Sequence, residues 1–345
     1  MPFLSKRLFN IILIFISLAV FTGCVAPVPV PTPTVTTVNT PLPTPTSTPI
    51  PPGSPGNPVV IGYILPEDNP AAQSAIETLT GELIARTGYS IAAAIYPNYN
   101  ELLTGFRSGS VQAAWLLPLT YLFLNSRGYV EVRLLTNHFG TYYYGTQILA
   151  NIESGLTSYF DPRTNTNTTE AEIALSQLDG LRPCWVDEGS LSGFIYPYGL
   201  LRQMDIELLP GAFVQSHTAV VRSLYIKGVC DFGATFSESG DPRTASAVVA
   251  DLPDVAERVV VLWQSDADIP GLNFSISPEL SEEIRKSLTQ TLIELVNTET
   301  GKLILTDATG GYDIQDLRVV DDSIYDPLRV LLHYSGVEPG AWLGR

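Results

Sequence analysis

VVIGYILPEDNPAAQSAIETLTGELIARTGYSIAAAIYPNYNELLTGFRSGSVQAAWLLP, residues 59–118, alternates short apolar runs with amphipathic segments. The three apolar runs, at 59–65, 90–97 and 111–118, have the length and composition of buried strands. Between them, over 69–85 and 99–109, apolar residues recur mostly at every third or fourth position, which predicts helices. Strands that alternate with helices predict an α/β fold with a largely parallel sheet.

The alternation continues toward the C-terminus after a polar stretch at 156–178, which we expect to be a surface loop with a short helix. Further strands are predicted at 183–186, 213–217, 229–236, 259–265 and 273–278. Helices are predicted to follow several of them, the longest at 278–297. No repeat of 20–50 residues is visible in the sequence, which argues against a solenoid.

The N-terminus predicts export. Lys6 and Arg7 precede an apolar run, so residues 1–23 are typical of a secretory signal, with an uncleaved membrane anchor as the alternative. The sequence Phe21-Thr22-Gly23-Cys24 resembles the bacterial lipoprotein box, which implies acylation of Cys24 and anchoring to the outside of the cell membrane. Residues 24–58, rich in Pro and Thr, predict an extended tether before a folded part that starts at Val59.

The composition excludes several classes of function. With 35 acidic against 19 basic residues, the formal net charge is −16, which argues against a nucleic-acid partner. The three Cys are too few for a disulfide-stapled scaffold, and the three His are dispersed, so we expect neither a metal site nor a cofactor. A small anionic ligand stays compatible with this charge, because backbone N–H groups and hydroxyls bind anions without positive side chains.

Two predicted turns from a strand into a helix carry residues suited to an anion. The first, DEGSLSG at 187–193, places Ser and Gly beside the free N–H groups of a helix start. The second, QSHT at 215–218, places His217 at another helix start. Such turns on neighbouring strands open at the same edge of a sheet, where α/β folds bind ligands. The alternatives are that Ser190 or Ser192 only caps a helix and that His217 is a buried structural residue.

The order of four motifs resembles the phosphate/phosphonate-binding family of extracytoplasmic solute-binding proteins, which serve ATP-driven (ABC) importers. The motifs are YPNYNELLTGFRSGSVQAAWLLPLTY (96–121), DGLRPCWVDEGSLSGF (179–194), QSHTAVVRSLYIKGVCDFGAT (215–235) and VVVLWQSDADIPG (259–271). The resemblance implies an α/β, two-lobed periplasmic-binding-protein type II fold, with two mixed sheets flanked by helices and a hinged cleft. It places lobe 1 at 59–145 plus 240–345 and lobe 2 at 146–239.

The same resemblance implies a binding site and partners. The family's anion loop matches Ser190-Leu191-Ser192-Gly193, with Leu191 where the family usually has Thr, and its Ser/Gly-His pair matches Ser216-His217. A carboxylate that meets an ammonium group in aminoalkylphosphonate binders matches Glu238, whereas the second such carboxylate falls at Leu272. The ligand-binding residues expected on this basis are Tyr99, Trp115, Tyr144, Ser190, Leu191, Ser192, Gly193, His217 and Glu238.

We therefore expect a monomeric, lipid-anchored protein that captures a phosphonate, phosphite or phosphate and delivers it to an ABC permease. No catalytic residue is expected. Two other functions stay open: a sensor subunit for a signalling receptor, and a lipid-anchored hydrolase with Ser190 or Ser192 as nucleophile and His217 as base. Cys184 and Cys230 fall on strands expected to be neighbours, where the sequence allows either a disulfide or two separate thiols.

Overall fold

The computed structural model of the chain describes residues 50–65 and 68–342. The predicted signal segment, Cys24 and most of the predicted tether lie outside the described residues. The last part of that tether contacts the folded part, because the N–H of Ser90 donates to the carbonyl of Gly53 at 2.7 Å. None of the helices in the described ranges is long and apolar enough to cross a membrane.

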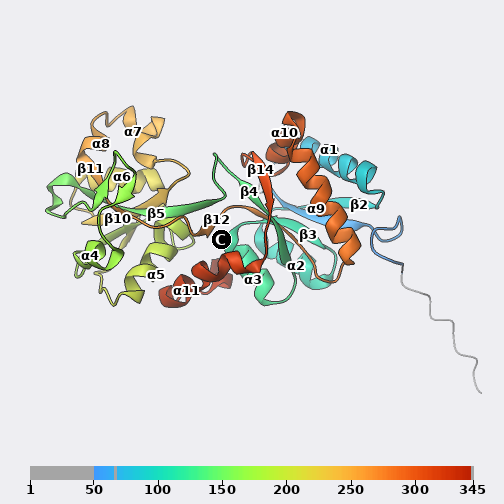
Figure 1. Ribbon diagram of the computed structural model, residues 1–345, viewed down its shortest axis with the longest axis horizontal. Helices are drawn as coiled ribbons and strands as arrows, with labels where there is room; N and C mark the ends of the chain where they lie inside the picture. Colours follow the sequence, from blue (N-terminus) through green and yellow to red (C-terminus); the bar gives the residue numbers. More distant parts are fainter. Residues whose placement is uncertain (1–49, 66–67, 343–345) are drawn as a thin grey trace, which may run out of the picture. The chain divides into compact units, whose positions relative to one another are not determined.

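The first lobe is built on a six-stranded mixed sheet in the order β14-β4-β13-β3-β1-β2 (Figure 1). Strand β1 is parallel to its two neighbours, whereas β13 is antiparallel to β3 and β4, and β14 is antiparallel to β4. The strands are β1 (Val59–Ile64), β2 (Ile91–Tyr96), β3 (Ala113–Leu116), β4 (Glu131–Asn137), β13 (Asn273–Ile276) and β14 (Asp316–Val319).

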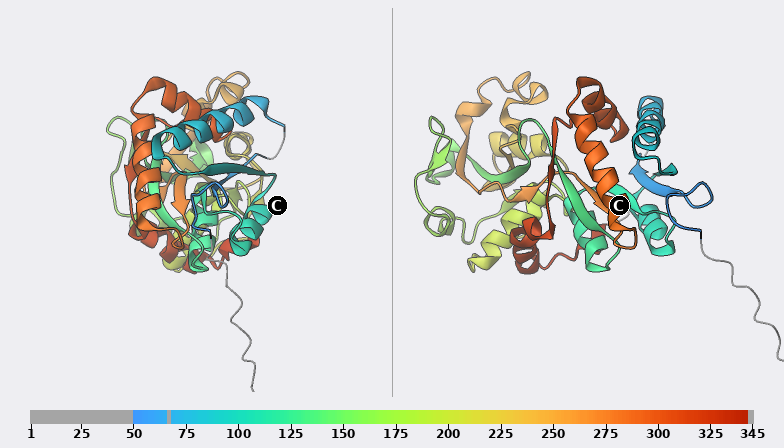
Figure 2. Two further views of the ribbon diagram at one scale, coloured as in Figure 1. Left: turned by 90° about the vertical axis from the view of Figure 1, so that its right-hand side faces the viewer. Right: turned by 45° about the vertical axis from the view of Figure 1, so that its right-hand side comes forward.

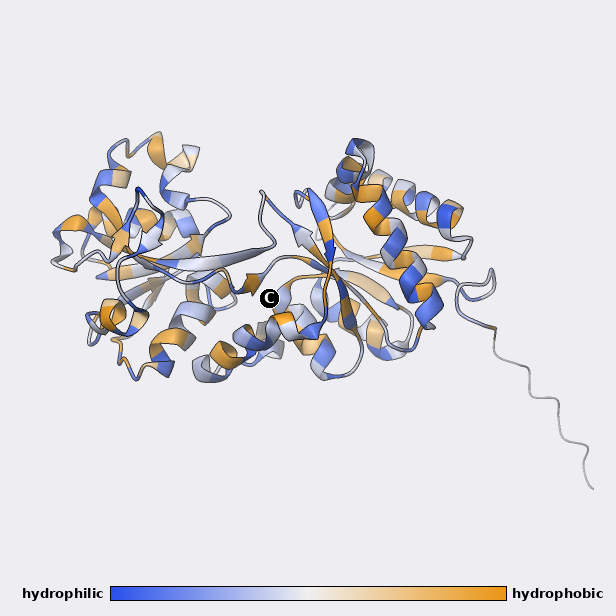
Figure 3. Cartoon of the chain, viewed as in Figure 1, coloured by the Kyte–Doolittle hydropathy of each residue, from blue (hydrophilic) through white to orange (hydrophobic). Residues whose placement is uncertain are grey.

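Helices cover both faces of this sheet, as the apolar periodicity predicts. Helices α1 (Pro70–Thr87), α9 (Glu282–Val296) and α10 (Glu299–Ala308) share one apolar core with it, and α1 and α9 lie side by side in both views of Figure 2. Helices α2 (Tyr99–Ser108) and α3 (Pro118–Ser126) belong to the core on the other face. The hydropathy colouring shows apolar and polar residues alternating along the outer helices (Figure 3), which is expected when one face is buried.

The ends of α1 illustrate how local sequence sets these boundaries. The side chain of Asn69 accepts a hydrogen bond from the N–H of Ala72, and Pro70 occupies the first helical position, where its missing donor costs nothing. Gly88 ends the helix in the left-handed conformation, with φ of 72°, and its N–H donates to the carbonyl of Ile84.

The second lobe contains a second mixed sheet, in the order β11-β5-β10-β8-β9. Its strands are β5 (Tyr143–Asn151), β8 (Pro183–Trp185), β9 (Ala212–Phe213), β10 (Phe232–Ser237) and β11 (Val259–Gln264). Helices α4 (Ala171–Ser176) and α5 (Tyr196–Gln203) pack on one face, and α6 (His217–Ile226), α7 (Ser246–Val249) and α8 (Val255–Arg258) on the other. The two mixed sheets flanked by helices confirm the predicted fold class.

The division between the lobes differs from the prediction at one point. The predicted boundary at residue 239 assigns β11 to the first lobe, whereas β11 pairs antiparallel with β5 from Val259↔Asn151 to Gln264↔Gln147. The second lobe therefore extends to about Gln264. Strands β5 and β11 are distant in sequence, so only their hydrogen bonds reveal the pairing.

Two antiparallel segments connect the lobes. Short strand β12 (Ile269–Pro270) pairs with the start of β5, with Ile269 opposite Tyr144 and Pro270 opposite Tyr143. Beside them, a Cβ atom at Gly145 would stand only 2.8 Å from the hydroxyls of Ser237 and Ser265 and 2.9 Å from the carbonyl of Asp266. Glycine is therefore required where these segments meet.

The C-terminal helix α11 (Asp326–Ser335) packs against α5 of the second lobe. Leu328, Leu331 and Leu332 are buried in the same apolar cluster as Ile195 and Tyr196. The helices approach so closely that a Cβ atom at Gly199 would lie 2.2 Å from the carbonyl oxygen of Leu331. The two lobes thus share part of their apolar core in addition to the two connecting segments.

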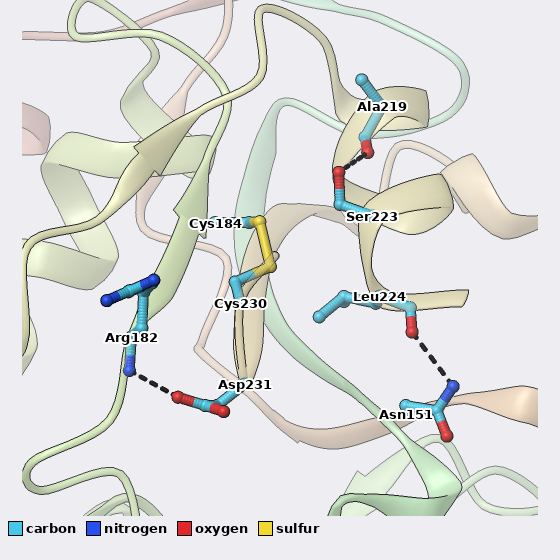
Figure 4. The surroundings of a disulfide bond; sticks show 8 residues. All are labelled: Asn151, Arg182, Cys184, Ala219, Ser223, Leu224, Cys230 and Asp231. Carbon is cyan, nitrogen blue, oxygen red and sulfur yellow. Dashed lines mark hydrogen bonds between the residues drawn. A yellow bond between two sulfur atoms is a disulfide. The ribbon is translucent and has the colours of Figure 1, made fainter. Parts of the chain in front are cut away.

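Cys184 and Cys230 form a disulfide, which decides between the two alternatives left by the sequence (Figure 4). Parallel pairing of β8 with β10 places Gly233 opposite Cys184, and Cys230 lies just before β10. Next to the bond, the carboxylate of Asp231 accepts a hydrogen bond from the N–H of Arg182 at 2.8 Å. The disulfide joins the start of β8 to the segment that enters β10.

Candidate functional site

A cavity of about 380 Å³ is lined by residues of both lobes and of the segments that connect them. The first lobe contributes Leu117, His138, Leu272 and Tyr312, among others, and the second contributes Ser190–Ser192, His217, Phe236 and Ser239. The connecting segments add Thr141–Tyr144, Pro270 and Gly271. Its volume lies in the range of small-molecule sites, ~300–1,000 Å³.

The turn after β8 contributes Ser190, Leu191 and Ser192 to the lining of this cavity. Ser190 caps a single π-helical turn, Leu191–Ile195, which continues into α5, and its Oγ accepts a hydrogen bond from the N–H of Gly193 at 3.1 Å. The N–H groups of Leu191 and Ser192 begin the helical segment, where no intrahelical acceptor exists. Ser190 therefore fulfils the capping role and also lines the cavity, so the two interpretations of the sequence are compatible.

Ser192 and Gly193 are fixed by contacts behind this turn. Ser192 is buried, lines the cavity, and its carbonyl accepts a hydrogen bond from the hydroxyl of Thr146 at 2.7 Å. Gly193 does not line the cavity. A Cβ atom there would lie 2.3 Å from the side chain of Val186, so this glycine lets the turn pack against the end of β8.

His217 is the first residue of α6, directly after Ser216, whose hydroxyl caps the helix by accepting from the N–H of Ala219 at 3.1 Å. The imidazole stands edge-on to Phe236, with ring centroids 4.8 Å apart, and its Nδ1 is buried without a hydrogen-bond partner among the described residues. Burial lowers the pKa of His217 to about 4, against an opposing effect of Asp187. The ring is therefore neutral near pH 7 and offers one N–H donor.

All three consecutive tyrosines of the connecting segment, Tyr142 to Tyr144, line the cavity. The hydroxyl of Tyr142 donates to Asp316, and the guanidinium of Arg318 lies 3.9 Å from its ring centroid. Burial raises the pKa of Tyr144, which stays a neutral hydroxyl. Tyr144 is thus a donor available to a ligand, whereas the hydroxyl of Tyr142 is already engaged.

The remaining predicted residues lie outside the lining of this cavity. Tyr99 begins α2 and lines a neighbouring cavity of about 300 Å³, which shares Tyr144 and Leu191 with the main one. Trp115 is buried in the core of the first lobe, with its ring centroid 4.9 Å from that of Phe274. Glu238 is exposed and follows β10 with φ of 68°, so its neighbour Ser239 reaches the cavity instead.

Sequence reasoning missed the wall that the first lobe contributes. His138 and Phe139 lie in a tight turn after β4, and Tyr312 comes from the loop before β14. The rings of His138 and Tyr312 stack at 4.1 Å with 21° between their planes. Nothing in the local pattern of these residues indicates a site, because the contact depends on β14 pairing with β4.

A two-lobed α/β body with a small cavity between its lobes, lined by helix-start hydroxyls and a neutral histidine, defines a solute-binding protein. The sequence matches, over residues 61–325, the family described as ABC transporter, phosphonate, periplasmic substrate-binding protein, and the chain belongs to this family. No curated protein matches the sequence.

Solved structures support the fold. The Xanthomonas citri protein XAC2383, in a structure bound to chloride ion, is 16% identical, with a TM-score of 0.58 over 81% of this chain and 97% of that one. PhnD1 from Prochlorococcus marinus, in complex with methylphosphonate, is 16% identical, with a TM-score of 0.50 over 79% of this chain and 96% of that one.

Proposed function

We propose that the protein is the lipid-anchored binding component of an ABC importer and that it captures a phosphonate-like oxyanion in the cavity between its lobes. Membership in the family supports a transport role outside the cytoplasm. The single observation that carries the ligand class is the turn at Ser190–Ser192, which lines the cavity and begins a helical segment whose first N–H groups have no intrahelical acceptor.

In this proposal the anion oxygens accept hydrogen bonds from Ser190, from the N–H groups of the turn and from the neutral imidazole of His217. Tyr144 adds a donor from the connecting segment, so groups from more than one part of the chain meet the same ligand. A ligand that bridges both lobes stabilises the closed arrangement over the open one, and its capture therefore couples to closure.

Thermal unfolding of the full chain, purified in detergent, tests this site with phosphate, phosphite, methylphosphonate, 2-aminoethylphosphonate and sulfate. A ligand at 100 times its Kd stabilises the folded state by about 2.7 kcal/mol. We expect a phosphorus oxyanion to bind, and we expect Ser190→Ala and His217→Ala each to weaken its binding at least tenfold. Matched exchanges at exposed positions, Ser126→Ala and His333→Ala, leave the affinity unchanged. Unaltered affinity in both site variants would place the ligand elsewhere.

The lipid anchor rests on the sequence around Cys24 alone and has its own test. Metabolic labelling with a radioactive fatty acid is expected to mark the intact chain and to fail with Cys24→Ser. The exchanged chain is then recovered in the soluble fraction. Labelling that persists in the variant would contradict the anchor at this residue.

A further inference from the structure

The turn at His138–Thr141 places the side chain of Phe139 in the cavity lining, and the backbone of Phe139 adopts an unfavourable conformation there. His138 and Thr141 exchange backbone hydrogen bonds of 2.7 and 3.1 Å, and Phe139 adopts φ of 48°. A left-handed conformation at a bulky residue costs ~1–3 kcal/mol. The Phe139 side chain, which lines the cavity, is nevertheless 63% exposed, so packing within the described residues offsets little of this cost.

The neighbouring rings are held rigidly. Nδ1 of His138 lies 2.9 Å from the carbonyl oxygen of Asp313. The ring of Tyr312 is held by its hydroxyl, which accepts a hydrogen bond from the N–H of Leu272 at 3.2 Å. With Phe139 at 4.2 Å from His138 and Tyr312 stacked on it at 4.1 Å, three rings form a preorganised surface. We call Phe139, His138 and Tyr312 the aromatic wall.

The described residues that line the cavity carry no acidic or basic side chain other than histidine. None of its lining residues is Asp, Glu, Lys or Arg, and the lining includes the apolar side chains of Leu117 and Leu272. Arg318 places a guanidinium cation over the ring of Tyr142, one of the aromatic residues that line the cavity. The carboxylate of Asp316 accepts a hydrogen bond from the Tyr142 hydroxyl. Among the described residues, no carboxylate lines the cavity to pair with an ammonium group on the ligand.

The cavity has room for a ligand larger than the anion alone. A five-atom ion such as methylphosphonate displaces the volume of about five waters, roughly 150 Å³ at ~30 Å³ per water. That is less than half of the 380 Å³ available. The lining of the cavity includes aromatic rings and leucines, which favour an uncharged, flat substituent through apolar burial and ring stacking.

We propose that the ligand is an organophosphonate or phosphate monoester with a flat, uncharged, aromatic-type substituent. Its oxyanion lies at Ser190–Ser192 and its flat group lies against the aromatic wall. This inference rests on the proposed function and adds the class of the substituent. It assigns Phe139, His138 and Tyr312 the role of determining specificity.

Isothermal titration of the full chain in detergent tests the inference with methylphosphonate, phenylphosphonate, cyclohexylphosphonate, 2-aminoethylphosphonate and phenyl phosphate. We expect phenylphosphonate to bind at least tenfold more tightly than methylphosphonate and 2-aminoethylphosphonate, and more tightly than the non-planar cyclohexyl compound. Comparison of phenylphosphonate with phenyl phosphate shows whether the site prefers a phosphonate or a phosphate monoester. A preference for either compound is consistent with the proposal, which includes both classes.

Exchange of Phe139 identifies the surface responsible. Phe139→Asn removes the ring but suits the left-handed backbone, so the fold is retained. We expect it to weaken phenylphosphonate binding at least fivefold while methylphosphonate binding changes less than twofold. Phe213→Asn is the matched control, because Phe213 is also exposed but lies away from this cavity, and it leaves both affinities unchanged.

Four results would overturn the inference. If methylphosphonate binds as tightly as phenylphosphonate, or if Phe139→Asn weakens both equally, the aromatic wall does not select the ligand, although the oxyanion site stands. Tighter binding of 2-aminoethylphosphonate would show that a cationic substituent is preferred. If no phosphorus anion binds at all, the proposed function itself fails.

Discussion

Lowering the pH is expected to destabilise the ligand-free protein through His217. Burial beside Phe236 holds the pKa of His217 at about 4, against 6.5 for an exposed imidazole. Between these values the unfolded chain binds a proton that the folded protein does not, so the free energy of unfolding falls as the pH falls from 6.5 toward 4. At about 1.4 kcal/mol per pH unit, the total loss attributable to this residue is roughly 3 kcal/mol.

Urea unfolding at a series of pH values between about 4 and 7.5 measures this contribution, with the slope against urea checked for constancy. The wild-type protein is compared with His217→Gln, which cannot titrate, and with His333→Gln, which alters an exposed histidine. Subtracting the His217→Gln profile from that of the wild type removes the background of titrating carboxylates. Saturating anion is expected to reduce the difference, because a negative neighbour favours the imidazolium.

The reasoning is refuted if the wild type and His217→Gln lose stability in parallel over this range. Such a result would mean that the imidazole becomes charged in the folded protein at no cost. His217 would then be well solvated, and its role as a neutral donor in the proposed site would lose its basis. A pH dependence that disappears in His333→Gln would instead locate the effect on α11.

Three further predictions concern other features. Replacing Cys184 and Cys230 by Ser opens a loop with a sequence separation of 46 and is expected to lower the free energy of unfolding by about 4 kcal/mol, measured by urea unfolding; a change below 1 kcal/mol would contradict it. Gly199→Ala is expected to lower the free energy of unfolding by ~1–3 kcal/mol, because the added Cβ meets the α11 backbone. Gly81→Ala, in open space on α1, is expected to raise it slightly. Thermal unfolding of both variants measures the difference. Glu238→Gln is expected to change the affinity for a phosphorus anion less than twofold in titration calorimetry, and a larger loss would show that this exposed side chain reaches the ligand.

Much of the fold could be predicted because its signals are local. The alternation of apolar runs with amphipathic segments over 59–118 predicts β1 to β3 and the helices between them within a few residues. Asn69 and Gly88 mark the ends of α1 by their own chemistry. The helix starts at Ser190 and His217 are predictable for the same reason, since each follows directly on a strand or turn.

The missed features depend on contacts between segments far apart in sequence. The apolar run of β11 predicts a strand, yet only its pairing with β5 shows to which lobe it belongs. Trp115 resembles a cleft residue by its neighbours in sequence, but the alternation along β3 turns it toward Phe274. The aromatic wall needs Tyr312 to reach His138 over more than 170 residues, a contact that no local pattern encodes.

The position of β13 between β3 and β4 has a consequence for the order of folding. This central strand of the first sheet begins at Asn273, so it is synthesised only after the whole of the second lobe. The second sheet, from Tyr143 to Gln264, is contiguous and can form before the first is complete. Closing the first sheet then requires strands separated by well over 100 residues to meet, which makes folding slow. A chain that emerges N-terminus first would thus complete its second lobe ahead of its first.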